Sequence, residues 1–287
     1  KSVRIHADEI ADRIVRDVRA LPRRNTPSIR AVRVKYSKEL KETPAATIVA
    51  LAHALRERNM RWVGYEILHH HREALASLRI REVEELAEGL ESWDGVDTFG
   101  IYIAGPAWRA GQIKDADLVH WARSRNLWIR RAALVATVVL NSKKRGRGAE
   151  GGDAERTVKI MTLLLNDRED MVVKAMSWAL RALSVADPET ARTFLEAHEP
   201  QLARRVVRET RNKLETGLKS RAGSVSELRQ NLSAERSEAI FSAETFEFGF
   251  RVFQQHLHNS RLRNNTARTL VGRKAFWGAI LVRTQHE

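Results

Sequence analysis

The sequence contains no cysteine, and this absence excludes several kinds of chemistry. Without cysteine the chain cannot form a disulfide framework, a thiolate metal site or a cysteine nucleophile. A reducing compartment fits that absence. No apolar run approaches the roughly 20 residues that a membrane span needs. The N-terminal stretch KSVRIHADEIADRIV is charged throughout and lacks the apolar centre of a signal peptide, so we expect a cytoplasmic protein.

Common catalytic motifs are also missing. The sequence has no glycine-rich phosphate loop, no HExxH or GxSxG motif and no paired-glutamate constellation. His69, His70 and His71 are adjacent, so their side chains diverge around a helix and cannot bind one metal ion together. We therefore expect neither a metal nor a cofactor.

Positive charge is abundant. The formal net charge is +14, while the apolar and charged fractions, 43% and 30%, suit a folded chain. A surface this basic attracts polyanions, and nucleic acid is the commonest such partner. A membrane surface is disfavoured, because no single helix concentrates lysine and arginine opposite an aromatic face.

Apolar residues recur every three or four positions up to about residue 215, and strand-like alternation is missing. This spacing predicts amphipathic helices, as at Ile48, Leu51, Ala52 and Leu55. Thr43 and Pro44 are expected to be the N-cap and the first helical residue of one of them. Bulky apolar markers also recur at a longer period, at Val63, Val96, Ile129, Val173 and Val206.

The intervals between these markers are 33, 33, 44 and 33 residues. The long interval contains an insert at residues 142–153. A period of this length built from helix pairs predicts an all-α fold, an α-solenoid of repeats. We expect the repeat domain to occupy residues 1–220, followed by a C-terminal extension of unknown role at 221–287.

Equivalent positions in a solenoid lie along one surface, and here they carry charge. The two positions after each marker place four cations on that surface, Arg130, Arg131, Lys174 and Arg208, with the carboxylate Asp97 among them. The series predicts a basic groove; ordinary solvated helix faces are the alternative. The insert adds Lys143, Lys144 and Arg145, which would clamp a phosphate backbone or form a plain linker.

Two tryptophans and one carboxylate are candidates for chemistry. Trp93 and Asp97 are four residues apart and would share one helix face. Trp178 lies between Lys174 and Arg181. An indole offers a π-face to a base or a cation, and a carboxylate among cations stays ionised. Taken alone, Asp97 is better explained as a helix cap or an arginine partner. Trp62, Trp121 and Trp128 lie among apolar helix positions and are expected in the core.

Four stretches together resemble one family, in this order: SWDGVD at 92–97, RNLWIRRAAL at 125–134, DMVVKAMSWALRALSVADPE at 170–189 and LARRVVRETRNKL at 202–214. They are similar to the AlkD-like DNA alkylation-repair glycosylases over roughly residues 5–216. The resemblance implies a HEAT-like solenoid whose concave basic face binds duplex DNA. It also implies excision of cationic N3- and N7-alkylpurines without a metal.

The resemblance assigns roles to particular residues. Trp93, Asp97 and Trp178 fall on positions that contact the sugar and backbone at the lesion, and Arg131 falls on a DNA-contacting arginine. Arg181, beside Trp178, is a further candidate DNA contact. The implied protein is a monomeric, monofunctional glycosylase that leaves an abasic site and works at the nucleoid. Two alternatives remain: a non-catalytic solenoid that recognises bent or branched DNA, and a protein-binding scaffold.

Overall fold

The computed structural model describes residues 2–142 and 152–219. They all belong to the first of two compact units, Lys1–Leu228. The insert side chains Lys143, Lys144 and Arg145 and the extension at 221–287 lie outside the described residues, so their roles stay predictions.

The described part of the chain is all α, as the sequence predicts, and contains no strand. Its first half comprises α1 (Ser2–Arg19), α2 (Thr26–Glu39), α3 (Ala45–Glu57), α4 (Arg61–His70), α5 (Arg72–Ser77), α6 (Ile80–Ala87) and α7 (Trp93–Phe99). A π-helical turn, η1 (Gly100–Ala104), joins α7 to α8 (Gly105–Arg109). The remaining helices are α9 (Asp115–Ala122), α10 (Leu127–Leu140), α11 (Ala154–Leu163), α12 (Asp170–Ala186), α13 (Pro188–His198) and α14 (Arg204–Thr216).

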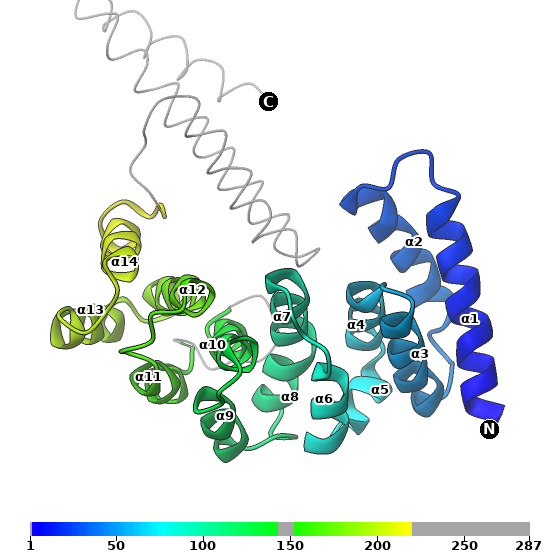
Figure 1. Ribbon diagram of the computed structural model, residues 1–287, viewed down its shortest axis with the longest axis horizontal. Helices are drawn as coiled ribbons and strands as arrows, with labels where there is room; N and C mark the ends of the chain where they lie inside the picture. Colours follow the sequence, from blue (N-terminus) through cyan, green and yellow to red (C-terminus); the bar gives the residue numbers. More distant parts are fainter. Residues whose placement is uncertain (1, 143–151, 220–287) are drawn as a thin grey trace, which may run out of the picture. The chain divides into compact units, whose positions relative to one another are not determined.

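The helices of this unit stack in two rows (Figure 1). One row runs through α2, α4, α7, α10, α12 and α14, and successive members pack on one another. Helices such as α9, α11 and α13 form the second row. This is the helical-repeat solenoid that the periodicity predicts.

The repeat markers fall at equivalent places in the first row. Val63, Val96, Ile129, Val173 and Val206 lie in the first turns of α4, α7, α10, α12 and α14. The insert behind the long interval separates α10 from α11, so it lengthens a connection and leaves the stacking of the row intact. The predicted repeat period is therefore confirmed.

Side-chain caps define several helix starts. The side chain of Asn126 accepts the backbone N–H of Trp128 at the start of α10, 2.8 Å away. Asp187 accepts the N–H of Thr190 at 3.0 Å, with Pro188 at the first position of α13. Such caps satisfy the donors that a helix leaves unpaired. The predicted Thr43 cap is wrong: Pro44 is itself the N-cap and α3 begins at Ala45.

The core lies between the two rows, and α10 is buried from Arg131 to Leu140. Of the tryptophans expected there, Trp121 is buried. Trp62 and Trp128 are only half-buried, which corrects the expectation for both. Each is the second residue of its helix, where the first turn still reaches solvent, and the Arg30 guanidinium lies over the Trp62 ring at 5.9 Å.

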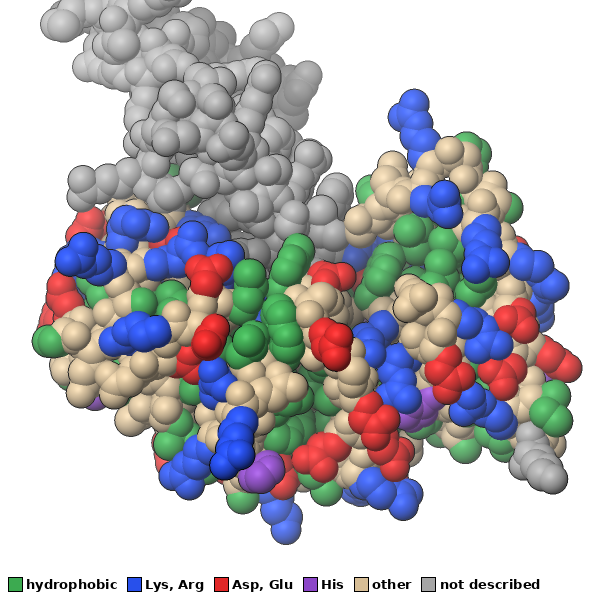
Figure 2. Space-filling view, viewed as in Figure 1, with side chains coloured by type: hydrophobic (Ala, Val, Ile, Leu, Met, Phe, Trp, Pro, Cys, Tyr) green, Lys and Arg blue, Asp and Glu red, His purple; other side chains and the backbone are tan. Residues whose placement is uncertain are grey.

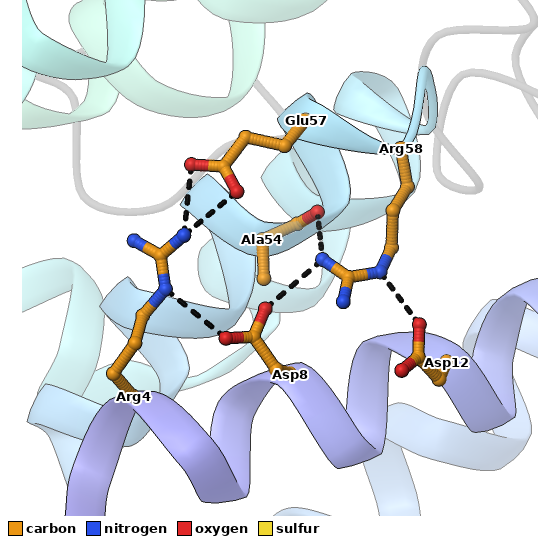
Figure 3. Close-up of polar contacts among 6 residues, drawn as sticks. All are labelled: Arg4, Asp8, Asp12, Ala54, Glu57 and Arg58. Atoms are coloured by element: carbon orange, nitrogen blue, oxygen red, sulfur yellow. Dashed lines mark hydrogen bonds and ion pairs between the residues drawn. The ribbon is translucent and has the colours of Figure 1, made fainter. Parts of the chain in front are cut away.

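An ion-pair network joins α1 to α3 at the start of the array (Figure 3). Arg4 binds Glu57 at 2.7 Å and Asp8 at 3.2 Å. Arg58 binds Asp8 at 3.0 Å and Asp12 at 2.8 Å. The hydrogen bond from Arg58 lowers the pKa of the Asp12 carboxyl. These side chains are partly or largely exposed, so water and salt weaken their attraction.

Candidate functional site

Asp97 and Arg131 form a buried ion pair between α7 and α10. Their exposed fractions are only 2% and 5%. Arg131 donates from Nε to Asp97 Oδ1 at 2.8 Å and from Nη2 to Oδ2 at 2.7 Å. Its Nη1 donates to the carbonyl of Met171 in α12. One side chain thus ties together three consecutive helices of the first row.

This arrangement gives Asp97 a structural role, and its catalytic role stays a prediction. The sequence left open an arginine partner for Asp97, and the structure shows that partner. Two charge-assisted hydrogen bonds thus fix the position of this carboxylate. Arg131, expected at a DNA-facing surface, has three of its nitrogens engaged inside the protein. Its contact with DNA stays a prediction.

The tryptophans predicted beside Asp97 differ in exposure. Trp93 begins α7, one turn before Asp97, and 44% of it is exposed. The turn between them therefore runs from solvent into the interior. Trp178 lies in the middle of α12 and is half-buried. Trp93 can meet a large ligand directly, with the Asp97 carboxylate one turn further along α7.

A second buried charge cluster lies between α12 and α14, around Glu209. Ser177 Oγ donates to Glu209 Oε2 at 2.6 Å, and Arg181 Nε lies 3.8 Å from the same oxygen. Arg205 Nε approaches Oε1 at 3.3 Å. Arg181, expected as a DNA contact, is therefore buried against this carboxylate. Sequence reasoning missed Glu209 because nothing local marks a partner 32 residues away.

The other predicted cations also have acidic neighbours. Arg130 binds Asp167 at 2.7 Å, and Lys174 binds Asp170 at 2.7 Å. The hydrogen bond from Lys174 lowers the pKa of Asp170. The predicted series thus lies on successive helices as a row of ion pairs, which leaves less uncompensated charge than expected. Arg208 is the most exposed member, with 66% of its side chain accessible.

Sequence reasoning missed further arginines beside Arg208. Arg204 and Arg211 lie on the same face of α14 and line a shallow hollow with it, over Leu202 and Val207. Arg211 binds Glu199 at 2.7 Å. Figure 2 shows Lys and Arg side chains gathered over α14, whereas basic and acidic side chains alternate over α1–α6. The spacing of arginines in RRVVRETR could have identified this face.

A third buried carboxylate, Glu66 in α4, was also missed. It is 1% exposed and accepts from Arg33 Nε at 2.7 Å and from Arg30 Nη2 at 2.8 Å, both in α2. Like Asp97, Glu66 is a buried carboxylate paired with arginine, but it lies at the contact between α2 and α4. It therefore provides a built-in comparison for experiments on Asp97.

Two searches of the described residues concern metals and membranes. Residues 2–142 and 152–219 contain no group of three or more His, Asp or Glu placed to hold a metal ion. Within the same ranges, every helix is too short or too polar to cross a bilayer.

Comparison with known proteins gives one match. A family model described as DNA alkylation repair enzyme matches residues 10–214, which is more than half of the chain. No curated protein and no solved structure matches the chain. The matched range contains the Asp97–Arg131 pair, Trp93 and Trp178, together with nearly every described helix. The chain therefore belongs to the family of DNA alkylation repair enzymes.

Proposed function

We propose that this protein is a monofunctional DNA glycosylase that hydrolyses the N-glycosidic bond of N3- or N7-alkylated purines in duplex DNA. The observation that carries the proposal is the turn of α7 that joins exposed Trp93 to the buried, arginine-paired Asp97. Family membership supports repair of alkylated DNA, and the chemistry of these two residues suits the base-removal step.

The chemistry follows from the charge of the substrate. An N3- or N7-alkylated purine is already cationic, so the bond from C1′ to the base nitrogen breaks readily and releases a neutral base. Positive charge then develops on the sugar, and a nearby carboxylate stabilises it. Water adds to C1′, loses a proton and leaves an abasic site. No covalent enzyme intermediate is required.

Asp97 and the indoles have separate roles in this proposal. Arg131 binds both oxygens of the Asp97 carboxylate, so the negative charge has a fixed position from which to stabilise the sugar cation. Trp93 and Trp178 would pack against the sugar and backbone at the lesion. An exposed indole interacting with a cation contributes roughly 0.5–1 kcal/mol.

The direct test is release of 7-methylguanine from alkylated duplex DNA, followed under single-turnover conditions with enzyme in excess, which isolates bond cleavage from product release. We expect wild-type protein to release the base. Asp97→Asn should lower the rate per folded molecule by at least about 100-fold, as expected when several kcal/mol of transition-state stabilisation are lost.

Glu66→Gln is the matched control. Both substitutions remove a buried charge and leave buried arginines without their carboxylate, so both destabilise the fold. Only Asp97→Asn should slow excision once rates are corrected for the folded fraction. Equal rates for the two variants would make Asp97 purely structural. Failure of wild-type protein to release any N3- or N7-alkylpurine would favour a DNA-binding protein without glycosylase activity.

A further inference from the structure

The helix that carries Asp97 is interrupted directly after it. Between α7 and α8 the backbone widens into the π-helical turn η1, where the N–H of Gly105 donates to the carbonyl of Gly100. Every residue of this turn is buried. Such turns insert one extra residue into a helix and often occur at functional sites. The turn therefore changes the face that the following residues present to α10.

Two glycines of this helix face two valines of α10. A Cβ atom on Gly100 would lie 2.6 Å from Val135 Cγ1 and 2.9 Å from Val135 Cβ. A Cβ atom on Gly105 would lie 2.5 Å from Val139 Cγ2. Neither position can accept a side chain without movement of the helices. The valines are four residues apart and the glycines five, so the widened turn brings both glycines into register with one stripe of α10.

The Asp97–Arg131 pair belongs to the same contact between the two helices. Arg131 precedes Val135 by one turn on the stripe of α10, and Asp97 precedes Gly100 by about one turn on α7. The two hydrogen bonds of the pair, 2.8 and 2.7 Å long, close across the gap that the glycines permit. Hydrogen bonds weaken beyond about 3.2 Å, so a small outward shift of α7 would open both.

We infer that Gly100 is a positioning residue for Asp97. With the π-helical turn, it sets the depth at which α7 packs on α10, and this depth aligns the carboxylate with Arg131 and toward the substrate sugar. The inference rests on the proposed glycosylase function for its catalytic consequence. Its structural part concerns only the coupling between Asp97 and Arg131.

The first experiment measures excision of 7-methylguanine by Gly100→Ala, normalised to the folded fraction from circular dichroism. We expect a loss on the order of 100-fold, typical of a displacement near 1 Å. Val135→Ala removes the nearer clashing methyl groups, so Gly100→Ala/Val135→Ala should recover at least about tenfold of that rate; in free-energy terms this is 1.36 kcal/mol. Val139→Ala, at the neighbouring contact, should give no recovery.

Gly64→Ala is the control for simple overpacking. Its Cβ would lie 3.1 Å from the Ala52 backbone at the α3–α4 contact, away from Asp97. It should lower the melting temperature and leave the rate per folded molecule unchanged. If Gly100→Ala behaves in the same way, the inference is overturned. If Gly100→Ala does not fold, the excision rates per folded molecule of Gly100→Ala/Val135→Ala and Val135→Ala are compared instead. Equal rates for these two variants would overturn the inference.

A second readout does not need glycosylase activity. A double-mutant cycle with Asp97→Asn and Arg131→Gln measures the coupling of the pair in unfolding experiments. The cycle is run in the Val135→Ala background, with glycine and with alanine at position 100. We expect weaker coupling with alanine, and unchanged coupling would overturn the inference. Weaker coupling in a protein that releases no base would refute the proposed function and retain the positioning role of Gly100.

Discussion

At the scale of single residues, Arg131 shows how burial changes the expected effect of a substitution. Its sequence position suggested a contact with DNA. In the structure its guanidinium neutralises the buried Asp97 and also donates to Met171. Removing it leaves an uncompensated carboxylate in a low-dielectric interior, which is costly. Substituting Arg131 should therefore lower the stability of the protein more than it lowers the affinity for DNA.

We predict that Arg131→Ala lowers the free energy of unfolding by about 3–5 kcal/mol, the usual cost of breaking a buried ion pair. Urea denaturation monitored by circular dichroism measures this loss. Arg81→Ala is the control, because Arg81 is largely exposed and its ion pairs with Glu82 and Glu85 are solvated. It should change stability by less than about 0.5 kcal/mol. A wild-type denaturation curve for Arg131→Ala would contradict this account of the pair.

Trp93 is predicted to behave in the opposite way. Because 44% of it is exposed, Trp93→Ala should leave the melting temperature almost unchanged. It should slow excision by roughly 5- to 10-fold, the equivalent of about 1 kcal/mol of lost indole contact. Val185→Ala is a matched control, since Val185 is also 44% exposed. Equal excision rates for the two variants would remove Trp93 from the site.

At the scale of helices, α1 is held to α3 by exposed charges as well as by apolar packing. Arg58 bridges Asp8 and Asp12 of α1 and lowers the pKa of Asp12 (Figure 3). A carboxyl whose pKa is lower in the folded state stabilises that state above its unfolded pKa of about 3.9. The contribution is lost as the pH falls from there through the folded pKa.

We predict that α1 opens more readily than α10 as the pH is lowered below about 4. Hydrogen exchange of α1 amides, corrected for the intrinsic effect of pH on exchange, measures this opening. Arg58→Gln should increase exchange in α1 at neutral pH and reduce its further increase in acid. High salt should have a similar effect, because exposed pairs are screened. A pH response of α1 that Arg58→Gln leaves unchanged would disprove the electrostatic explanation.

Local sequence information predicts the helices well and the pairs between them poorly. Apolar periodicity places the helices, and the 33-residue interval places the markers at equivalent helix starts. The cap at Thr43 fails because the choice between neighbouring residues depends on backbone geometry. Asp97 and Arg131 were each identified from the sequence, but their ion pair depends on how α7 packs on α10. The π-helical turn has no local signature, so Gly100 gave no indication of its contact with Val135.

At the scale of the whole molecule, the position of the cations matters more for DNA binding than the net charge does. The net charge is +14, and Arg130, Arg131 and Arg181 contribute little to it locally because each lies against a carboxylate. Exposed cations on α14 remain, among them Arg208 and its neighbours around the hollow. We therefore expect these side chains to supply more phosphate contacts than the buried series does.

Duplex DNA affinity should fall steeply with salt, with a log–log slope near −0.9 for each neutralised phosphate. We predict that Arg208→Ala makes the slope shallower by about one unit. Arg81→Ala, on α6, should leave it unchanged and so controls for the loss of net charge. Fluorescence anisotropy across a salt series measures both. A flat response in the wild-type protein would refute binding through phosphate contacts, and equal slopes for the two variants would exclude Arg208 from the interface.

The burial of Asp97 against Arg131 has a consequence for how this family diverges. Substituting either residue alone destabilises the protein, whereas substituting both together destabilises it less. A descendant that lost its repair activity would therefore keep both residues through purifying selection on stability. Retention of the pair in a homologue is thus weak evidence that the homologue is an active enzyme. Trp93 is far more exposed than the pair, so selection on stability constrains it less once activity is lost, and it is the more informative marker.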